Sequence, residues 1–143
     1  MEAKRQGESY MDDIRWIQRF DNFTRACGLL SEIKIYEIED TPAIIREGFI
    51  QRFELTFELA WKTLKDFLEF EGVNVSPTPR NVIKEAFATN IIADGQIFID
   101  MLEARNLVTH KYDEETFDTV FVQIKESFQP ALEDLRGFLE DKK

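Results

Sequence analysis

Apolar residues recur along most of the chain at alternating spacings of four and three, which is the period of an amphipathic helix. The first such stretch predicts a helix over residues 11–37. Asp40 and Thr41 then precede Pro42, a pattern typical of a helix N-cap followed by a proline in the first turn. A second helix is therefore expected from this point to Gly72, where a glycine suits the C-terminal cap. The apolar face of the first helix consists of Trp16, Phe20, Phe23, Cys27 and Leu30.

The second helix has an apolar surface that is broader than one stripe. Two series repeat every seven residues, namely Ile50, Phe57, Leu64 and Phe53, Ala60, Phe67, whereas Leu55, Leu59 and Phe70 fall outside both. Such a surface indicates either a centrally placed helix or a helix that also forms a dimer face. Its polar side predicts three solvated ion pairs at i, i+4. These are Glu58 with Lys62, Lys62 with Asp66, and Lys65 with Glu69.

The rest of the chain continues the helical pattern. Residues 73–81 contain two prolines and predict a loop, which a short helix follows over residues 79–88 with Phe87 on its apolar face. Asp94 and Asp113 are expected to be N-caps of two further helices, and Pro130 should kink the last one. The sequence thus predicts an all-α fold, an up-and-down four-helix bundle with an extra short helix. We expect a flexible N-terminus over residues 1–10 and a single helical domain over residues 11–143.

Charge and composition exclude several classes of function. With 28 acidic and 18 basic residues among 143, the formal net charge is −10, so that any contact with RNA has to be local. One cysteine and one histidine are too few for a disulfide or an ordinary zinc site within one chain. We expect no metal, no cofactor and no membrane span, because no long uncharged apolar stretch occurs. A cytoplasmic location fits this composition.

One polar cluster interrupts the helical pattern, in the stretch ARNLVTHKYD at residues 104–113. Arg105 continues an apolar stripe, where an unpaired charge would cost several kcal/mol, so it needs a partner or an opening to solvent. His110 lies about 140° from Arg105 around an ideal helix. The two could converge if the helix ends near His110, or if a second chain contributes its own pair. A purely structural interpretation gives an interhelical salt bridge for Arg105, a C-terminal cap for His110 and a half-buried turn for Tyr112.

The segment R-N-L-V-T-H-K-Y at residues 105–112 resembles the R-x4-H-x-Y motif of the HEPN superfamily. Within that superfamily, three further segments resemble the nucleotidyltransferase substrate-binding family: FELTFELAWKTLKDFLEFEG at residues 53–72, RNVIKEAF after the proline loop, and HKYDEETF. The similarity spans residues 15 to 135. It implies a HEPN-like bundle that forms a homodimer and a partner chain that is a minimal nucleotidyltransferase. The chain would bind or present the nucleotide or nucleic-acid substrate of that transferase, in one interpretation as half of a toxin–antitoxin pair.

The resemblance also implies an alternative, a metal-independent ribonuclease toxin that the transferase silences by adding AMP to Tyr112. Arg105, Asn106 and His110 would then be the catalytic residues, with His110 as acid or base and Arg105 as a phosphate clamp. Further substrate-binding charge is expected from three basic residues, Arg80, Lys84 and Lys111. A third alternative is a structural helical dimer without catalysis.

Overall fold

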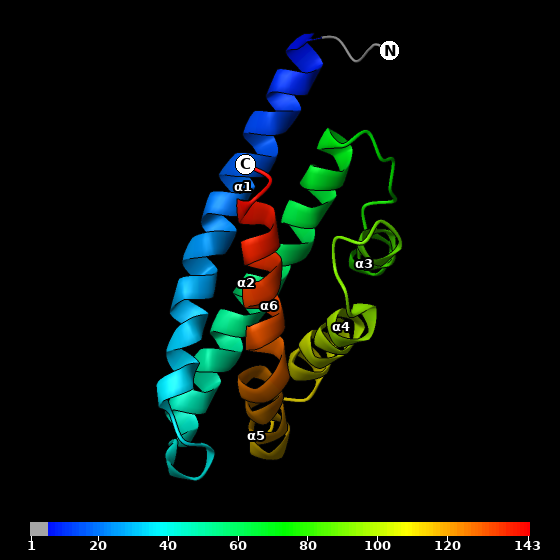
Figure 1. The fold of residues 1–143 in the computed structure, drawn as a ribbon. Coiled ribbons are helices and arrows are strands. Elements are labelled where there is room, and N and C mark those ends of the chain that lie inside the picture. Colours follow the sequence, from blue (N-terminus) through cyan, green and yellow to red (C-terminus); the bar gives the residue numbers. More distant parts are fainter. Residues whose placement is uncertain (1–5) are drawn as a thin grey trace.

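The computed structural model describes residues 6–143, and every regular element in this range is helical. In Figure 1 the chain passes down through α1, up through α2, down through α4 and up again through α5 and α6, while the short α3 joins the upper ends of α2 and α4. This arrangement confirms the predicted up-and-down four-helix bundle with an extra short helix. The α-helices are α1 (Gln6–Leu30), α2 (Ala43–Phe70), α3 (Pro79–Ala88), α4 (Gly95–His110), α5 (Glu114–Gln123) and α6 (Gln129–Glu140).

The first helix differs from its predicted bounds of residues 11–37 at both ends. The segment expected to be flexible, residues 1–10, lies partly outside the described residues, and the part from Gln6 onward forms the first turns of α1. The α-helix ends at Leu30, and a 3-10 turn over Ser31–Ile35 follows. Lys125 donates from Nζ to the carbonyl oxygens of Ile33 and Lys34, at 3.3 and 3.2 Å, which satisfies acceptors at this end.

The two ends of α2 are capped in different ways. Pro42, with extended backbone, occupies the N-cap position, and the Thr41 hydroxyl donates to the Glu37 carbonyl at 2.5 Å. The predicted cap by Asp40 and Thr41 is therefore wrong. At the other end, Gly72 has a φ of +83° and donates to the Glu69 carbonyl, while Val73 donates to the carbonyl of Leu68. This is a Schellman motif, and it confirms Gly72 as the residue that ends the helix.

The central position of α2 explains its broad apolar surface. It packs along α1 and also contacts α3, α4 and α5, and both of its heptad series are buried. Two predicted ion pairs form, Glu58 with Lys62 at 3.3 Å and Lys65 with Glu69 at 3.7 Å. The predicted pair of Lys62 with Asp66 is wrong, because Asp66 is buried and binds Arg19 of α1 instead. Leu55, in contrast, stays 55% exposed.

Pro130 lies in the second position of α6, directly after a π-helical turn over Ile124–Phe128. A proline cannot donate a backbone hydrogen bond, and its ring clashes with the preceding turn of a regular α-helix. The wider π turn relieves this conflict, so α5 and α6 continue as one interrupted helix, as expected from the sequence. Phe128 in this turn stacks on Phe53 of α2, with ring centroids 5.3 Å apart. None of the helices within residues 6–143 has the length and apolar character needed to cross a bilayer.

Candidate phosphate-binding site at the end of helix α4

Helix α4 fixes the position of the polar cluster. Its N-cap is Asp94, which accepts a hydrogen bond from the backbone N–H of Ile97, as predicted. The helix continues through His110 and ends where Lys111 adopts an extended backbone. Asp113 then caps α5 by accepting from the N–H of Thr116 at 2.8 Å, which confirms the second predicted cap. One face of α4 is anchored in the core by Phe98, Met101, Leu102, Ala104 and Val108.

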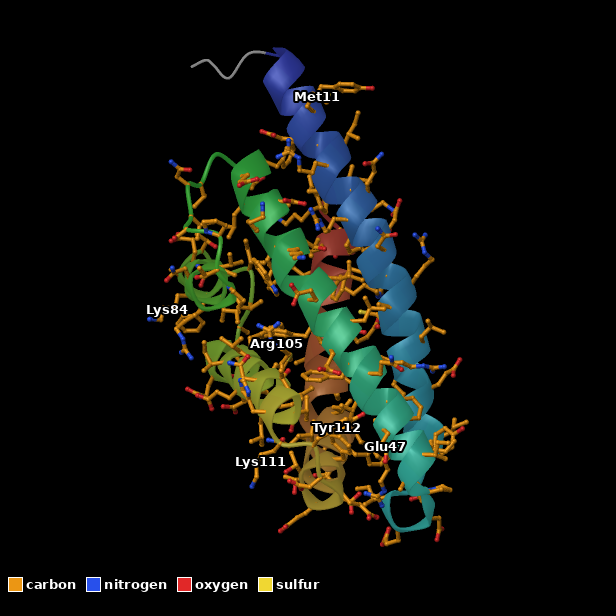
Figure 2. The ribbon with its side chains drawn as sticks, turned by 180° about the vertical axis from the view of Figure 1, so that it is seen from behind. Met11, Glu47, Lys84, Arg105, Lys111 and Tyr112 are labelled. Carbon is orange, nitrogen blue, oxygen red and sulfur yellow. The ribbon has the colours of Figure 1, made fainter. Side chains whose placement is uncertain are left out.

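Arg105 reaches from α4 toward α2, as Figure 2 shows. Its Nη1 atom lies 3.0 Å from Oε1 of Glu58, and its Nε donates to Oδ1 of Asn106 at 3.2 Å. The guanidinium carbon lies 5.7 Å from the ring centroid of the buried Phe57. The interhelical salt bridge predicted for Arg105 is thus confirmed. The side chain of Arg105 remains 26% exposed, so the guanidinium is held and still accessible.

Two carboxylates of α2 influence the charge around Arg105. Glu58 pairs with it directly, and Glu54 lies one turn earlier on the same helix. Burial raises the pKa of Glu54 above its ordinary value, and the charge of Arg105 opposes this shift. The positive charge of Arg105 is therefore partly compensated within the chain, directly by its ion pair with Glu58.

His110 is exposed at the last residue of α4. Because the helix is regular up to this residue, Arg105 and His110 keep the divergence of about 140° that helical geometry imposes. The sequence left open a helix end near His110 that turns this side chain toward Arg105. The structure does not adopt this arrangement. Within one chain, Arg105 is therefore grouped with Asn106 and Glu58 and not with the histidine.

Tyr112 is 85% exposed, so the prediction of a half-buried turn residue is wrong. The extended backbone at Lys111 carries the tyrosine past the end of α4, where its only ring contact among the described residues is with Phe117, at 5.1 Å between centroids. Tyr112 lines one end of a groove of about 590 Å³ between α2 and the end of α4, which Glu47, Glu54 and Thr109 also line. In Figure 2 the labelled Tyr112 lies across this groove from Glu47.

The three basic residues predicted to bind substrate lie at two separate places. Lys111 is exposed beside His110, whereas Arg80 and Lys84 are exposed on α3, which packs near the beginning of α4. The 16 residues of α4 span about 24 Å, and Figure 2 shows Lys84 and Lys111 toward opposite ends of this face. A single chain therefore keeps Arg80 and Lys84 apart from Lys111.

Lys84 instead borders a separate hollow of about 460 Å³. Phe87, which the sequence placed on an apolar face, is 53% exposed at this hollow. Its ring packs against Gly95, where an added Cβ atom would come within 3.2 Å of the ring, so this close approach favours a glycine at position 95.

Two residues of the site were not recognised from the sequence. Glu58 was assigned only to its ion pair with Lys62, and Glu54 was assigned no role. Both lie on the side of α2 that faces α4, and their relation to Arg105 depends on how the two helices pack. The sequence contains only one hint, the unpaired arginine in an apolar stripe, which demands an acidic partner without identifying it.

Comparisons with known proteins agree with this architecture. In Haemophilus influenzae, a protein named probable ribonuclease HepT is 29% identical over 91 residues, which cover 58% of this chain and 62% of that protein. A crystal structure of a protein from Thermus thermophilus is 30% identical, with a TM-score of 0.73, and the match covers 80% of this chain and 96% of that one.

A second solved structure, HI0074 from Haemophilus influenzae, is described as revealing the fold of a substrate binding domain of a nucleotidyltransferase. It is 25% identical, with a TM-score of 0.58, over 85% of this chain and 96% of its own. The family model described as "Nucleotidyltransferase substrate binding protein like" matches residues 18–141, which is most of the chain. The chain therefore belongs to the nucleotidyltransferase substrate-binding family, as the resemblance of its second and fourth helices indicated.

Proposed function

We propose that this chain is the partner subunit of a nucleotidyltransferase and that Arg105 binds a phosphate of the nucleotide or RNA substrate. Family membership and the description of HI0074 support the assignment to a transferase. The observation that carries the proposal is Arg105, whose guanidinium is fixed at Nε and Nη1 while its side chain remains 26% exposed. A forked, oriented cation of this kind suits a phosphate, which accepts paired hydrogen bonds from arginine.

The net charge of −10 sets the expected character of this binding. An acidic surface repels the rest of a polyanion, so few phosphates should be in contact and affinity should depend only weakly on salt. A short single strand or a nucleotide is therefore a better substrate than a long duplex.

Binding can be tested by fluorescence anisotropy with a labelled, 2'-O-methylated single-stranded RNA that cannot be cleaved. The Arg105→Ala variant should weaken binding by about tenfold or more, the effect of losing one strong charged hydrogen bond. Arg25→Ala is the matched control, because Arg25 is an exposed arginine on α1, on the opposite side of the bundle from α4. Equal affinities for the two variants would contradict the proposal.

A ribonuclease is the second candidate function, favoured by the exposure of His110 on the same helix as the fixed Arg105 and by the name of the HepT relative. The RNA 2'-oxygen would attack the adjacent phosphorus, and the bond from phosphorus to the 5'-oxygen would break. One His110 would accept the 2'-hydroxyl proton, and a second copy of this histidine, from a homodimer, would protonate the leaving oxygen. Arg105 would stabilise the charge that develops on the phosphorus oxygens, and Asn106 would hold Arg105.

Cleavage of an unmodified RNA in the presence of chelator tests this second candidate. The wild type should cut, and Arg105→Ala and His110→Ala should not cut at the same concentration of folded protein. If RNA binds at Arg105 but is not cut, the chain is a binding subunit. If RNA neither binds nor is cut, the third alternative, a structural helical dimer, gains support.

We further propose that Tyr112 is the acceptor of an AMP group from the transferase, which would make the two chains a toxin–antitoxin pair. The phenol oxygen would attack the α-phosphorus of ATP, pyrophosphate would leave, and the phenolic proton would pass to a base of the transferase. The 85% exposure of Tyr112 supports this role, because an acceptor side chain has to enter the active site of the transferase. The added AMP would carry a negative charge beside the groove that Glu54 and Thr109 also line, where it would repel RNA.

Mass spectrometry after incubation with the transferase and ATP tests the modification. The wild type should gain one adenylyl group, and Tyr112→Phe should gain none. Tyr10→Phe is the control, since Tyr10 is also strongly exposed, at 66%. Labelling that persists in Tyr112→Phe would contradict the assignment.

A further inference from the structure

Glu58 binds two cations, one with each carboxylate oxygen. Its Oε1 accepts from Nη1 of Arg105 at 3.0 Å, and its Oε2 lies 3.3 Å from Nζ of Lys62. The side chain of Glu58 is about one third exposed, at 34%. Glu58 thus joins α2 to α4 at the position where the candidate phosphate site begins.

The contacts of Arg105 fix the orientation of its guanidinium plane. Glu58 holds Nη1, Asn106 holds Nε, and the Phe57 ring lies beside the group at 5.7 Å. A guanidinium has five N–H groups, and the contacts to described residues engage only one on Nη1 and the one on Nε. Both N–H groups of Nη2 and one of Nη1 therefore remain for a phosphate.

Lys62 determines how Glu58 binds the arginine. A carboxylate alone with a guanidinium tends to form a forked pair that uses both oxygens and two N–H groups. Here the second oxygen of Glu58 is held by Lys62, so Glu58 contacts Arg105 through one oxygen only. Two cations, Arg105 and Lys62, thus share the single carboxylate of Glu58.

We propose that Glu58 is a positioning residue that orients the Arg105 guanidinium for substrate phosphate, and that Lys62 keeps Glu58 from occupying the N–H groups which the phosphate needs. This inference rests on the proposed role of Arg105 in phosphate binding.

It predicts a change in RNA affinity that is opposite in sign to simple charge repulsion. Removal of a carboxylate near a phosphate site normally strengthens the binding of an anion, whereas removal of Glu58 should weaken it.

The test compares Glu58→Ala with Glu69→Ala in the anisotropy assay with 2'-O-methylated RNA. Glu69 is a matched control because it also lies on α2, pairs with Lys65 and Arg15, and has a similar exposure of 35%. Glu58→Ala should weaken RNA binding by about threefold to tenfold, the entropic effect of leaving one long side chain unfixed. Glu69→Ala should leave affinity unchanged or slightly raise it, because it removes the same charge at a distance from Arg105.

A second readout reports the orientation of Arg105 without reference to RNA. Rotation of its guanidinium can be measured by nitrogen NMR, and it should become faster in Glu58→Ala. It should stay slow in Lys62→Met, where Glu58 still holds Nη1. Glu58→Gln keeps an oxygen that can accept from Nη1, so it should recover part of the affinity lost in Glu58→Ala. If the carboxylate were merely repulsive, both neutral variants would bind RNA more tightly than the wild type.

The outcomes separate the two proposals. If Arg105→Ala weakens binding but Glu58→Ala tightens it or leaves it unchanged, Glu58 is not a positioning residue and only this inference fails. Unchanged guanidinium rotation in a folded Glu58→Ala variant would overturn it as well. If the wild type does not bind RNA, or if Arg105→Ala binds as tightly as the wild type, the proposed function fails and takes this inference with it.

Discussion

Arg19 on α1 donates from Nε to Oδ2 of Asp66 on α2 at 2.9 Å, and the side chain of Asp66 is completely buried. The other oxygen, Oδ1, lies 3.3 Å from Nζ of Lys65. Among the residues whose burial is described, this carboxylate is the buried acidic group between α1 and α2. Its charge needs both cations, because an ionised carboxylate without partners is strongly disfavoured in a protein interior.

Replacement of Arg19 by methionine should therefore lower the free energy of unfolding by about 2 kcal/mol, less than for a fully isolated pair because Lys65 remains. Arg15→Met is the control, since Arg15 lies one turn earlier on α1, is 53% exposed and makes longer ion pairs. That change should cost less than about 1 kcal/mol. Urea unfolding of the two variants measures the difference. Equal losses would mean that the buried position of Asp66 contributes nothing.

The cap of α5 should make part of the stability sensitive to acid. Hydrogen bonds from the backbone N–H and the side chain of Thr116 hold the pKa of Asp113 below its ordinary value. Because the pKa of Asp113 is lower in the folded state, its ionisation stabilises the protein at pH values above the ordinary pKa. This contribution is lost as the pH falls through the folded-state pKa. Thermal unfolding between about pH 5 and pH 2 should thus be less dependent on pH in Asp113→Asn. An identical pH profile for the variant and the wild type would contradict this assignment.

Cys27 should resist modification in the folded protein. Burial, with a further contribution from Glu133, raises the pKa of this thiol to about 12, although Arg136 lowers it slightly. The reactive thiolate is therefore scarce at pH 8, and the side chain is only 3% exposed. Alkylation followed by mass spectrometry should be slow in native buffer and rapid in urea. Fast labelling of native protein would show that the core around Cys27 opens readily.

The raised thiol pKa also predicts a weaker fold in alkali. Because the folded pKa lies above the unfolded one, the stabilising contribution is complete below the unfolded value and is lost as pH rises from the ordinary value of 9.0 toward about 12. Cys27→Ala should lose this part of the pH dependence while being less stable overall. Unfolding curves at several alkaline pH values measure both effects.

Two glycines should respond to alanine with opposite signs. Gly72 has a φ of +83° after α2, a conformation that costs an alanine about 1 kcal/mol, so that Gly72→Ala should destabilise the protein. Gly137 lies inside α6, and a Cβ atom there would meet no other atom within 4 Å. Gly137→Ala should therefore stabilise the protein by up to about 1 kcal/mol. Thermal unfolding of the two variants measures these effects. A loss of stability in both variants would contradict the prediction of opposite signs.

Several local parts of the fold could be predicted from the sequence, although the bounds of α1 and the N-cap of α2 were not. Helix α3 has the expected bounds, and Asp94, Asp113 and Gly72 end or begin helices where they were expected to do so. These features depend on hydrogen bonds and backbone angles within a few residues, which the side chains themselves determine. The buried heptad positions of α2 follow from the same local period.

The candidate site was only partly predictable. The sequence identifies Arg105 as a cation that needs a partner, and the resemblance connects it with Asn106, His110 and Tyr112. It does not show that Glu58 is that partner, that Tyr112 is open to solvent, or that Arg80 and Lys84 lie near the other end of α4. Each of these facts concerns the packing of one helix against another.

The sequence alone thus determined which segments are helical, where most helices begin and end, and which side chains have to be buried. Tertiary structure alone decided which charges pair between helices. Arg19 with Asp66 and Glu58 with Arg105 are each separated by 47 residues. Asp66 and Glu58 both lie four residues from Lys62 in α2, yet Glu58 binds Lys62 whereas the buried Asp66 binds Arg19. An ion pair forms where packing brings opposite charges within a few ångströms and removes water, and the apolar contacts of the whole bundle determine that packing.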